Sequence, residues 1–113
     1  MELTVRSKFW VEQAGELVLS DWRIELLEAI DATGSLSAAC ARLNVAYRVG
    51  WGKIKEIEQR LGIALLDSRT GGPDGGSTQL TDAGRDLVAR YRRFRAGLPE
   101  LIRQRFEEEF GQL

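Results

Sequence analysis

The segment from Gly34 to Gly62 constrains the fold of this chain more than any other. Its apolar residues recur at the spacing of an amphipathic helix, first before and then after a short turn at residues 43–45. Asn44 suits that turn, because asparagine tolerates a left-handed backbone better than most residues do. The segment therefore predicts two helices joined by a tight turn, a helix-turn-helix at about 35–61.

The second of these helices, expected at about 46–60, has two unlike faces. One face carries Gly50, Ile54, Ile57 and Leu61 at spacings of four, three and four, which predicts that this face packs inward. At about 100° per residue, the opposite face carries polar or small residues: Arg48, Gly52, Lys55 and Gln59. Each glycine costs about 0.5–1 kcal/mol inside a helix. We therefore expect Gly50 to permit a close helix crossing and Gly52 to let another molecule approach the outer face.

Strand patterns flank the helix pair on both sides. Residues from Leu3 to Val11 alternate between two faces, which predicts a strand, and Leu17-Val18-Leu19 can return beside it. Behind the helix pair, IALLDSRT and TQLT enclose the glycine-rich GGPDGGS, which predicts a second hairpin at about 64–80. A hairpin in that position is the wing of a winged helix.

Side chains suited to N-caps precede the first two predicted helices. Ser20 or Asp21 offers a cap to a helix that ends at Thr33-Gly34. Ser35 or Ser37 offers one to the first helix of the pair. Together with the helix expected at about 46–60, these two capped helices give three helices in succession before the wing.

The last segment predicts one long amphipathic helix at about 82–110, capped by Thr81-Asp82. Pro99, after Gly97, should kink or interrupt it. The apolar stripe of this helix is longer than a small three-helix core can cover, which favours pairing with a second copy of the chain. We expect a mainly α protein with small β-hairpins, a single winged helix-turn-helix domain over 1–113 with a long C-terminal dimerisation helix.

Charge is distributed unevenly along the chain. The net charge of the 113 residues is −1, yet residues 35–95 hold eleven basic and six acidic side chains, and both flanks are acidic. The basic block coincides with the helix pair and the wing, which favours a nucleic-acid partner. Chance scatter of solvated charges is the alternative interpretation.

Residues for enzymatic chemistry are nearly absent. The chain has no histidine and a single cysteine, so neither an acid–base pair nor a metal or cofactor site is expected. Cys40 lies in an alanine-rich helical stretch and is expected to be buried. No run of apolar residues reaches membrane-spanning length, and the first residues alternate between polar and apolar where a signal peptide would have a basic patch and an apolar run. We therefore expect a soluble cytoplasmic protein without a membrane partner.

Residues near the start of the second helix of the pair are the best candidates for DNA contact, because that end enters the major groove. Arg48 is the candidate for a guanine edge, since its planar fork matches two acceptors. The expected DNA-contacting set also includes the wing: Ser37, Ala46, Tyr47, Arg48, Trp51, Gly52, Lys55, Arg69, Gly75 and Gly76. The alternatives are a solvated helix face, with Arg48, Lys53 and Lys55 paired to Glu56 and Glu58, and a Trp51 packed against the wing.

Two stretches resemble the N-terminal DNA-binding domain of the ModE-type molybdate-responsive transcription regulators, relatives of the LysR-type winged helix. They are LLEAIDATGSLSAACARLNVAYRVGW, from Leu26 to Trp51, and LLDSRTGGPDGGSTQLTDAG, from Leu65 to Gly84. The resemblance implies a bacterial repressor or activator that binds a palindromic double-stranded operator as a homodimer. It also implies base contacts at Tyr47, Arg48 and their neighbours.

The chain departs from that family in several places. Asn44 replaces the usual turn glycine, Gly50 replaces alanine or a larger residue, and Pro73-Asp74 lies where a wing often has a basic residue. The oxyanion-binding region of the family is absent before Leu113, so molybdate binding is not expected. A protein-interaction winged helix without DNA-reading activity is the competing hypothesis, favoured by the acidic wing residue and the near-neutral net charge.

Overall fold

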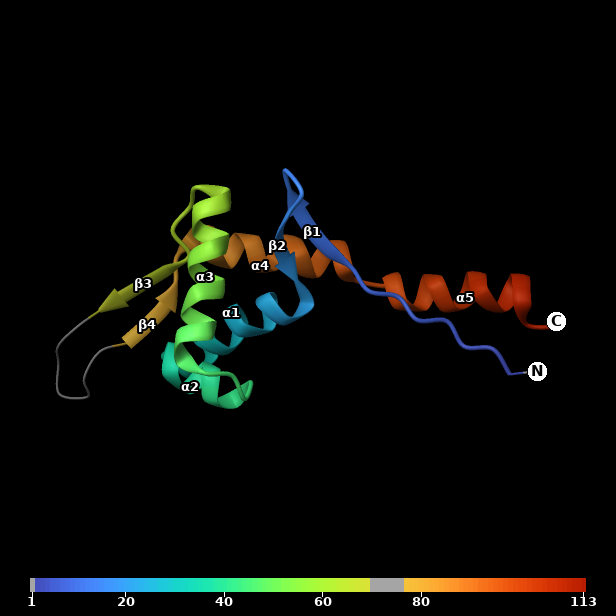
Figure 1. Cartoon of the computed structure of the whole chain (residues 1–113), viewed down its shortest axis with the longest axis horizontal. Coiled ribbons are helices and arrows are strands. Elements are labelled where there is room, and N and C mark those ends of the chain that lie inside the picture. Colours follow the sequence, from blue (N-terminus) through green and yellow to red (C-terminus); the bar gives the residue numbers. More distant parts are fainter. Residues whose placement is uncertain (1, 70–76) are drawn as a thin grey trace.

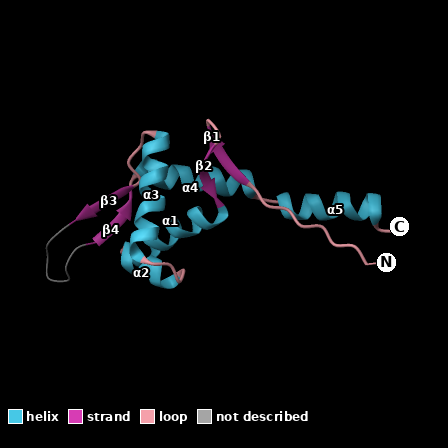
Figure 2. Ribbon diagram, viewed as in Figure 1, coloured by secondary structure: helices cyan, strands magenta, loops and turns pink. Residues whose placement is uncertain are grey.

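The computed structural model describes residues 2–69 and 77–113, which form five helices and two antiparallel hairpins (Figures 1 and 2). In chain order the elements are β1 (Trp10–Gln13), β2 (Glu16–Ser20), α1 (Asp21–Thr33), α2 (Leu36–Arg42), α3 (Tyr47–Leu61), β3 (Leu66–Arg69), β4 (Ser77–Leu80), α4 (Asp82–Arg95) and α5 (Leu98–Phe110). The predicted fold class, a mainly helical winged helix-turn-helix, is confirmed. No helix in the described part of the chain is long and apolar enough to cross a membrane.

Helix α1 is the centre of the core. It contacts α2, α3 and α4, and its Ile24, Leu26, Leu27 and Ile30 are each 0% exposed. From α3, Ile54 and Ile57 complete the same cluster. Burying aliphatic side chains of this size contributes about 1.5–3 kcal/mol each, so this cluster is the main source of stability.

Caps fix the helix boundaries as the sequence suggested. Ser20 caps α1 by accepting a hydrogen bond from Arg23 N, and Ser35 caps α2 by accepting one from Ala38 N. Ser35 is thus the cap of α2, and Ser37 lies exposed in its first turn. Gly34 ends α1 in the left-handed conformation that favours glycine (φ 74°).

The turn between α2 and α3 has the predicted geometry. Asn44 is left-handed (φ 56°), and the Val45 amide donates to the Cys40 carbonyl over 2.9 Å. Gly50 faces the buried Cys40, and a Cβ added to it would come closer than 3.0 Å to the Cys40 Sγ. The predictions of an inward Gly50 and a buried Cys40 are both confirmed.

The predicted N-terminal strand is wrong over most of its length. The strand begins at Trp10, which pairs with Ser20, and residues 3–9 lie in no strand. The partner strand explains the difference, because β2 has five residues and α1 begins directly after it. Residues before Trp10 therefore have no backbone to pair with, and their alternating pattern does not produce a sheet.

The wing hairpin is confirmed where the structure describes it. β3 and β4 pair from Leu66↔Leu80 to Arg69↔Ser77. The amide of Thr78 donates to the Gly34 carbonyl over 2.8 Å, which ties the wing to the end of α1. The predicted wing residues Pro73, Asp74, Gly75 and Gly76 lie outside the described residues.

The predicted helix at 82–110 is two helices. Ala96 and Gly97 interrupt the helix between α4 and α5. Gly97 has a left-handed backbone (φ 77°), and Pro99 lies in the first turn of α5. The interruption expected near Pro99 is thus confirmed. Helix α5 has no buried residue and projects from the opposite end of the molecule to the wing (Figure 1).

Candidate nucleic-acid interface

Helix α3 packs against the core through one face, and its opposite face is on the surface. Gly50, Ile54 and Ile57 face the core and are buried, as their spacing predicted. Its N-cap residue, Ala46, provides no side-chain hydrogen bond, so the first turn of α3 keeps outward-facing amide groups. Such amides, at the positive end of the helix dipole, suit a phosphate group. Figure 1 shows α2, α3 and the wing gathered at one end of the molecule.

Arg48 and its neighbours lie on the surface at the start of α3. Tyr47 is 54% exposed and Trp51 is 48% exposed. The exposed Arg48 side chain forms no ion pair or hydrogen bond with any described residue. A Cβ added to Gly52 would meet nothing within 4 Å, so this glycine opens onto solvent. The guanidinium of Arg48 is therefore available to a partner, and Trp51 is not packed away.

Lys55 differs from Arg48, because it has a partner within α3. Its Nζ lies 3.0 Å from Oε1 of Glu58 and 5.5 Å from the centre of the Trp51 ring. Burial raises the pKa of Glu58, but hydrogen bonds from the Leu65 amide and from Lys55 outweigh it and hold that pKa below its ordinary value. The solvated-face interpretation thus applies to Lys55. Its ammonium group adds positive charge to the surface, but it lacks the planar guanidinium that could donate two parallel hydrogen bonds to a base.

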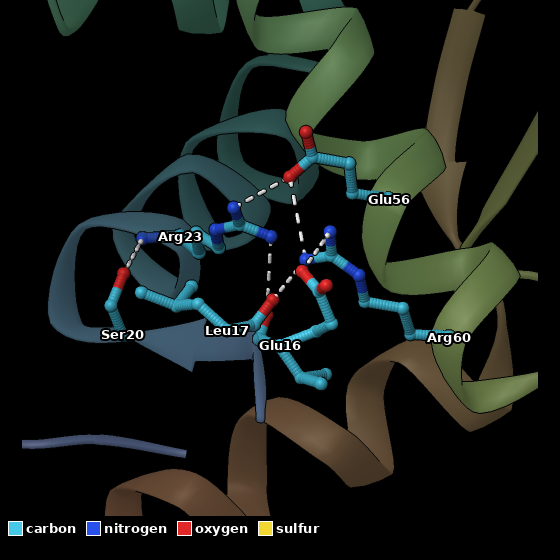
Figure 3. Close-up of polar contacts among 7 residues, drawn as sticks. Glu16, Leu17, Ser20, Arg23, Glu56 and Arg60 are labelled. Atoms are coloured by element: carbon cyan, nitrogen blue, oxygen red, sulfur yellow. Dashed lines mark hydrogen bonds and ion pairs between the residues drawn. The ribbon is translucent and has the colours of Figure 1, made fainter. Parts of the chain in front are cut away.

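The alternative interpretation, in which Glu56 pairs with Arg48, Lys53 or Lys55, does not hold among the described residues. Glu56 instead lies 2.7 Å from Nη2 of Arg23 on α1 and 3.7 Å from Nη1 of Arg60 (Figure 3). Arg23 is 6% exposed, the one buried charged residue in the described part of the chain. Its burial was not predicted from the sequence, although Arg23, Leu27 and Ile30 share helical spacing and therefore lie on one common face.

The remaining predicted contact residues are spread around α3. Ser37 is exposed on α2, Ala46 is exposed at the start of α3, and Arg69 is exposed at the end of β3. Gly75 and Gly76 lie outside the described residues. Among the described candidates for DNA contact, Gly52 and Lys55 are half-buried and the others are exposed. Five of them lie together on the first turns of α3: Ala46, Tyr47, Arg48, Trp51 and Gly52.

Two arginines of α4 are bonded to carboxylates of α1. Arg92 Nε lies 3.1 Å from Glu28, and Arg95 Nε lies 3.0 Å from Asp21, both on α1. The hydrogen bond from Arg95 is the main cause that lowers the pKa of Asp21, and Tyr91 also donates to this carboxylate. These contacts fasten α4 to α1, away from α3.

Comparisons with known proteins agree with this geometry. The model of the family described as "Bacterial regulatory helix-turn-helix protein, lysR family" matches residues 22–85. The "Molybdenum transport protein ModE" of Azotobacter vinelandii is 43% identical over 74 residues, which are 66% of this chain and 27% of that protein. The "Molybdenum-pterin-binding protein MopB" of Rhodobacter capsulatus is 35% identical over 80 residues, 71% of this chain and 30% of that protein. The chain therefore spans less than a third of the length of these relatives.

Solved structures share the fold. The crystal structure of the CbnR_DBD–DNA complex matches 80% of this chain and 94% of that chain, with a TM-score of 0.55 and 23% identity. Full-length CbnR complexed with its target DNA matches 78% of this chain and 29% of that chain, with a TM-score of 0.59 and 24% identity. At these identities the likeness concerns the winged-helix architecture.

Proposed function

The chain belongs to the lysR family of bacterial regulatory helix-turn-helix proteins, and from that premise we propose that it is the DNA-binding part of a transcription regulator of the ModE type. The relatives named ModE support the type, since they are 31–43% identical over 69–80 residues of this chain. The ligand is double-stranded DNA with a specific sequence.

The observation that carries this proposal is the state of Arg48. Its side chain is exposed in the first turn of α3 and unpaired within the described residues, on a helix whose opposite face is anchored by Gly50. A free guanidinium at that place can donate two hydrogen bonds to the O6 and N7 atoms of guanine, worth about 1–3 kcal/mol of discrimination between bases. We assign base reading to Arg48.

The other contacts divide between bases and the sugar-phosphate backbone. Tyr47 and Trp51 flank Arg48 and offer a hydroxyl group and apolar rings, and Gly52 leaves room for the DNA to come close. Contacts that position the protein on the phosphates are assigned to Ser37, Ala46, Lys55, Arg69, Gly75 and Gly76.

We propose that the regulator acts as a homodimer on a palindromic operator. Phe94 is 53% exposed, Leu101 41% and Phe110 48%, and no residue of α5 is buried in the single chain. Exposed apolar side chains along one helical segment favour association with a second copy. A two-fold dimer presents two α3 helices, and such proteins bind half-sites about one helical turn of DNA apart.

Selection of duplexes from a random-sequence DNA pool tests the proposal. Binding of the selected duplex should weaken steeply with salt, because phosphate contacts release counterions. Arg48→Ala should lower the preference for the selected duplex over a scrambled one, and Lys55→Ala should weaken both about equally. Arg93→Ala, which removes one exposed positive charge from α4, is the matched control and should leave the preference unchanged.

Two results would reject this function: no binding at low salt, or equal affinity of the wild type for every sequence. Either result would favour the second candidate, a winged helix that binds another protein. The observation behind that candidate is the apolar surface at the start of α3, where Val49 is 41% exposed between Tyr47 and Trp51. Light scattering tests the dimer separately: the measured mass should be twice the 12.7 kDa of one chain.

A further inference from the structure

A network of ionic and hydrogen-bonded groups joins α3 to α1 and to the β1–β2 hairpin (Figure 3). We call it the Arg23–Glu56 network; its members are Glu16, Leu17, Val18, Arg23, Glu56 and Arg60. The hairpin precedes residues 22–85, the part that matches the family model, so membership of the family assigns this hairpin no role.

Arg23 is the inner end of the network. Its Nη2 donates to Glu56 Oε2 over 2.7 Å, and its Nη1 lies 3.4 Å from the Val18 carbonyl of β2. The Arg23 side chain is 7% exposed. One planar guanidinium therefore holds a carboxylate of α3 and a carbonyl of β2 at the same time.

Arg60 closes the network from the other side. It donates to the Leu17 carbonyl, and its Nη2 lies 3.2 Å from Glu16 Oε2. The same guanidinium lies 3.7 Å from Glu56 Oε2. The hydrogen bond from Arg23 is the largest influence that lowers the pKa of Glu56; burial opposes it, and Lys53 and Arg60 add to the lowering. The Glu56 carboxylate thus lies between two guanidinium groups, and each of them also donates a hydrogen bond to a backbone carbonyl of β2.

An ion pair with one buried member, such as Arg23 with the 38% exposed Glu56 side chain, is weak support for stability as such. Desolvation of the two charges offsets much of their attraction, and apolar replacements of similar volume are often as stable or more stable. Such a pair does, however, constrain orientation. Aliphatic contacts such as those of Ile54 and Ile57 are non-directional and resist separation of α3 from α1. Hydrogen bonds require particular angles, so they also resist rotation of α3 about its own axis.

We propose that Arg23 and Glu56 are positioning residues, which set the rotation of α3 against α1 and thereby the direction in which Arg48 points. This inference rests on the proposed function for its consequence on DNA. Sequence reading needs side chains held within about 0.5 Å of their productive geometry by groups behind them. The hairpin supplies the fixed carbonyls against which both arginines are aligned.

The test compares the double variant Arg23→Met/Glu56→Met with the wild type. Replacing both partners leaves no unpaired buried charge and retains side-chain volume, so the variant should fold with a thermal midpoint near that of the wild type. The control is Asp86→Asn/Arg90→Met, which removes an ion pair of the same 2.7 Å length that lies exposed within α4. Arg60→Met is the second variant: its side chain is 27% exposed, so folding should persist even if the double variant fails to fold.

Two measurements decide the outcome. Residual dipolar couplings of backbone amides, recorded without DNA, report the orientation of α3 relative to α1. They should change in the double variant and, to a smaller degree, in Arg60→Met, and stay unchanged in the control. The preference for the duplex selected by the wild type over a scrambled duplex should fall by about 10- to 100-fold in the double variant, as expected when an arginine–guanine contact is misaligned.

An unchanged orientation in Arg60→Met and in any folded double variant overturns the inference, whatever happens to DNA binding. A changed orientation with an undiminished preference for the selected duplex also overturns it. If the wild type itself shows no preference for any sequence, the proposed function fails, and the dipolar couplings still decide whether the network orients α3.

Discussion

The close approach of α2 and α3 at Gly50 gives the sharpest prediction about stability. An ideal Cβ on Gly50 would lie closer than 3.0 Å to Cys40 Sγ and 3.8 Å from Leu26 Cδ2. Cys40 is 2% exposed and has one rotatable side-chain bond, so its sulfur has no open space to move into. Gly50→Ala therefore forces the two helices apart or strains the cysteine rotamer.

Two opposing effects set the magnitude. Alanine stabilises a helix interior by about 0.5–1 kcal/mol relative to glycine. Overpacking a well-filled core by one carbon costs about 1–3 kcal/mol. The overpacking is larger, so we expect Gly50→Ala to lower the free energy of unfolding by about 0.5–2 kcal/mol. For a chain of 113 residues this corresponds to a fall of roughly 2–8 °C in the thermal midpoint.

Urea denaturation followed by circular dichroism measures the effect, and Gly52→Ala is the matched control. Gly52 lies two residues further along α3, and its added Cβ would meet nothing within 4 Å. Gly52→Ala should therefore show the helix gain alone and raise the stability by about 0.5–1 kcal/mol. The same substitution at two glycines of one helix is thus expected to have opposite signs.

A double-mutant cycle with Cys40→Ala identifies the cause. Removing Sγ leaves a cavity when Gly50 is present, but makes room for the new methyl group when it is not. The free energy of unfolding of the double variant should therefore exceed the value expected from adding the two single effects by about 1–2 kcal/mol. A Gly50→Ala protein as stable as Gly52→Ala, or a cycle with purely additive effects, would refute the close-crossing explanation.

Three further predictions concern α3, the core and the α1–α4 contact. Gly52→Ala should stabilise the fold and yet weaken binding to the selected duplex in a titration, because the proposed interface needs the open space at this position. The Cys40 thiol, whose pKa burial raises, should react with a disulfide reagent only as fast as the protein unfolds in urea. Burial, followed by the hydrogen bond to Asp21, raises the pKa of Tyr91 from 10.0 to about 12, so the stability from this group is complete below pH 10 and is lost as the pH rises towards 12. Tyr91→Phe should flatten that part of the pH profile of unfolding; an unchanged profile would show that folding does not raise the pKa of Tyr91.

The sequence predicted those parts of the fold that depend on neighbours within a few residues. The α2–α3 turn at Asn44, the inward Gly50 and the cap at Thr81 all follow from local geometry, and the structure has each of them. The outward position of Arg48 followed in the same way, because helical periodicity alone separates it from Ile54.

The features that the sequence did not predict depend on partners far along the chain. Glu56 is separated from Arg23 by 33 positions, and Arg95 is separated from Asp21 by 74, so no spacing rule joins them. The first strand also depends on a partner that the local pattern does not reveal. Its alternating residues satisfy the local pattern, but the strand begins only at Trp10, where a partner backbone exists.

The two kinds of contact hold α3 in complementary ways. Gly50, in the first half of the helix, sets its distance from α2, and Glu56, in the second half, is bonded to α1. The side chains of Arg48 and Gln59 are exposed on the outer face of α3 and form no hydrogen bond with any described residue. Substitutions on the outer face should therefore change which DNA sequence is bound at little cost in stability, whereas changes at Gly50 or Glu56 alter stability or alignment for every sequence. Under the proposed function, this separation would let one scaffold present different base-reading residues without a change of fold.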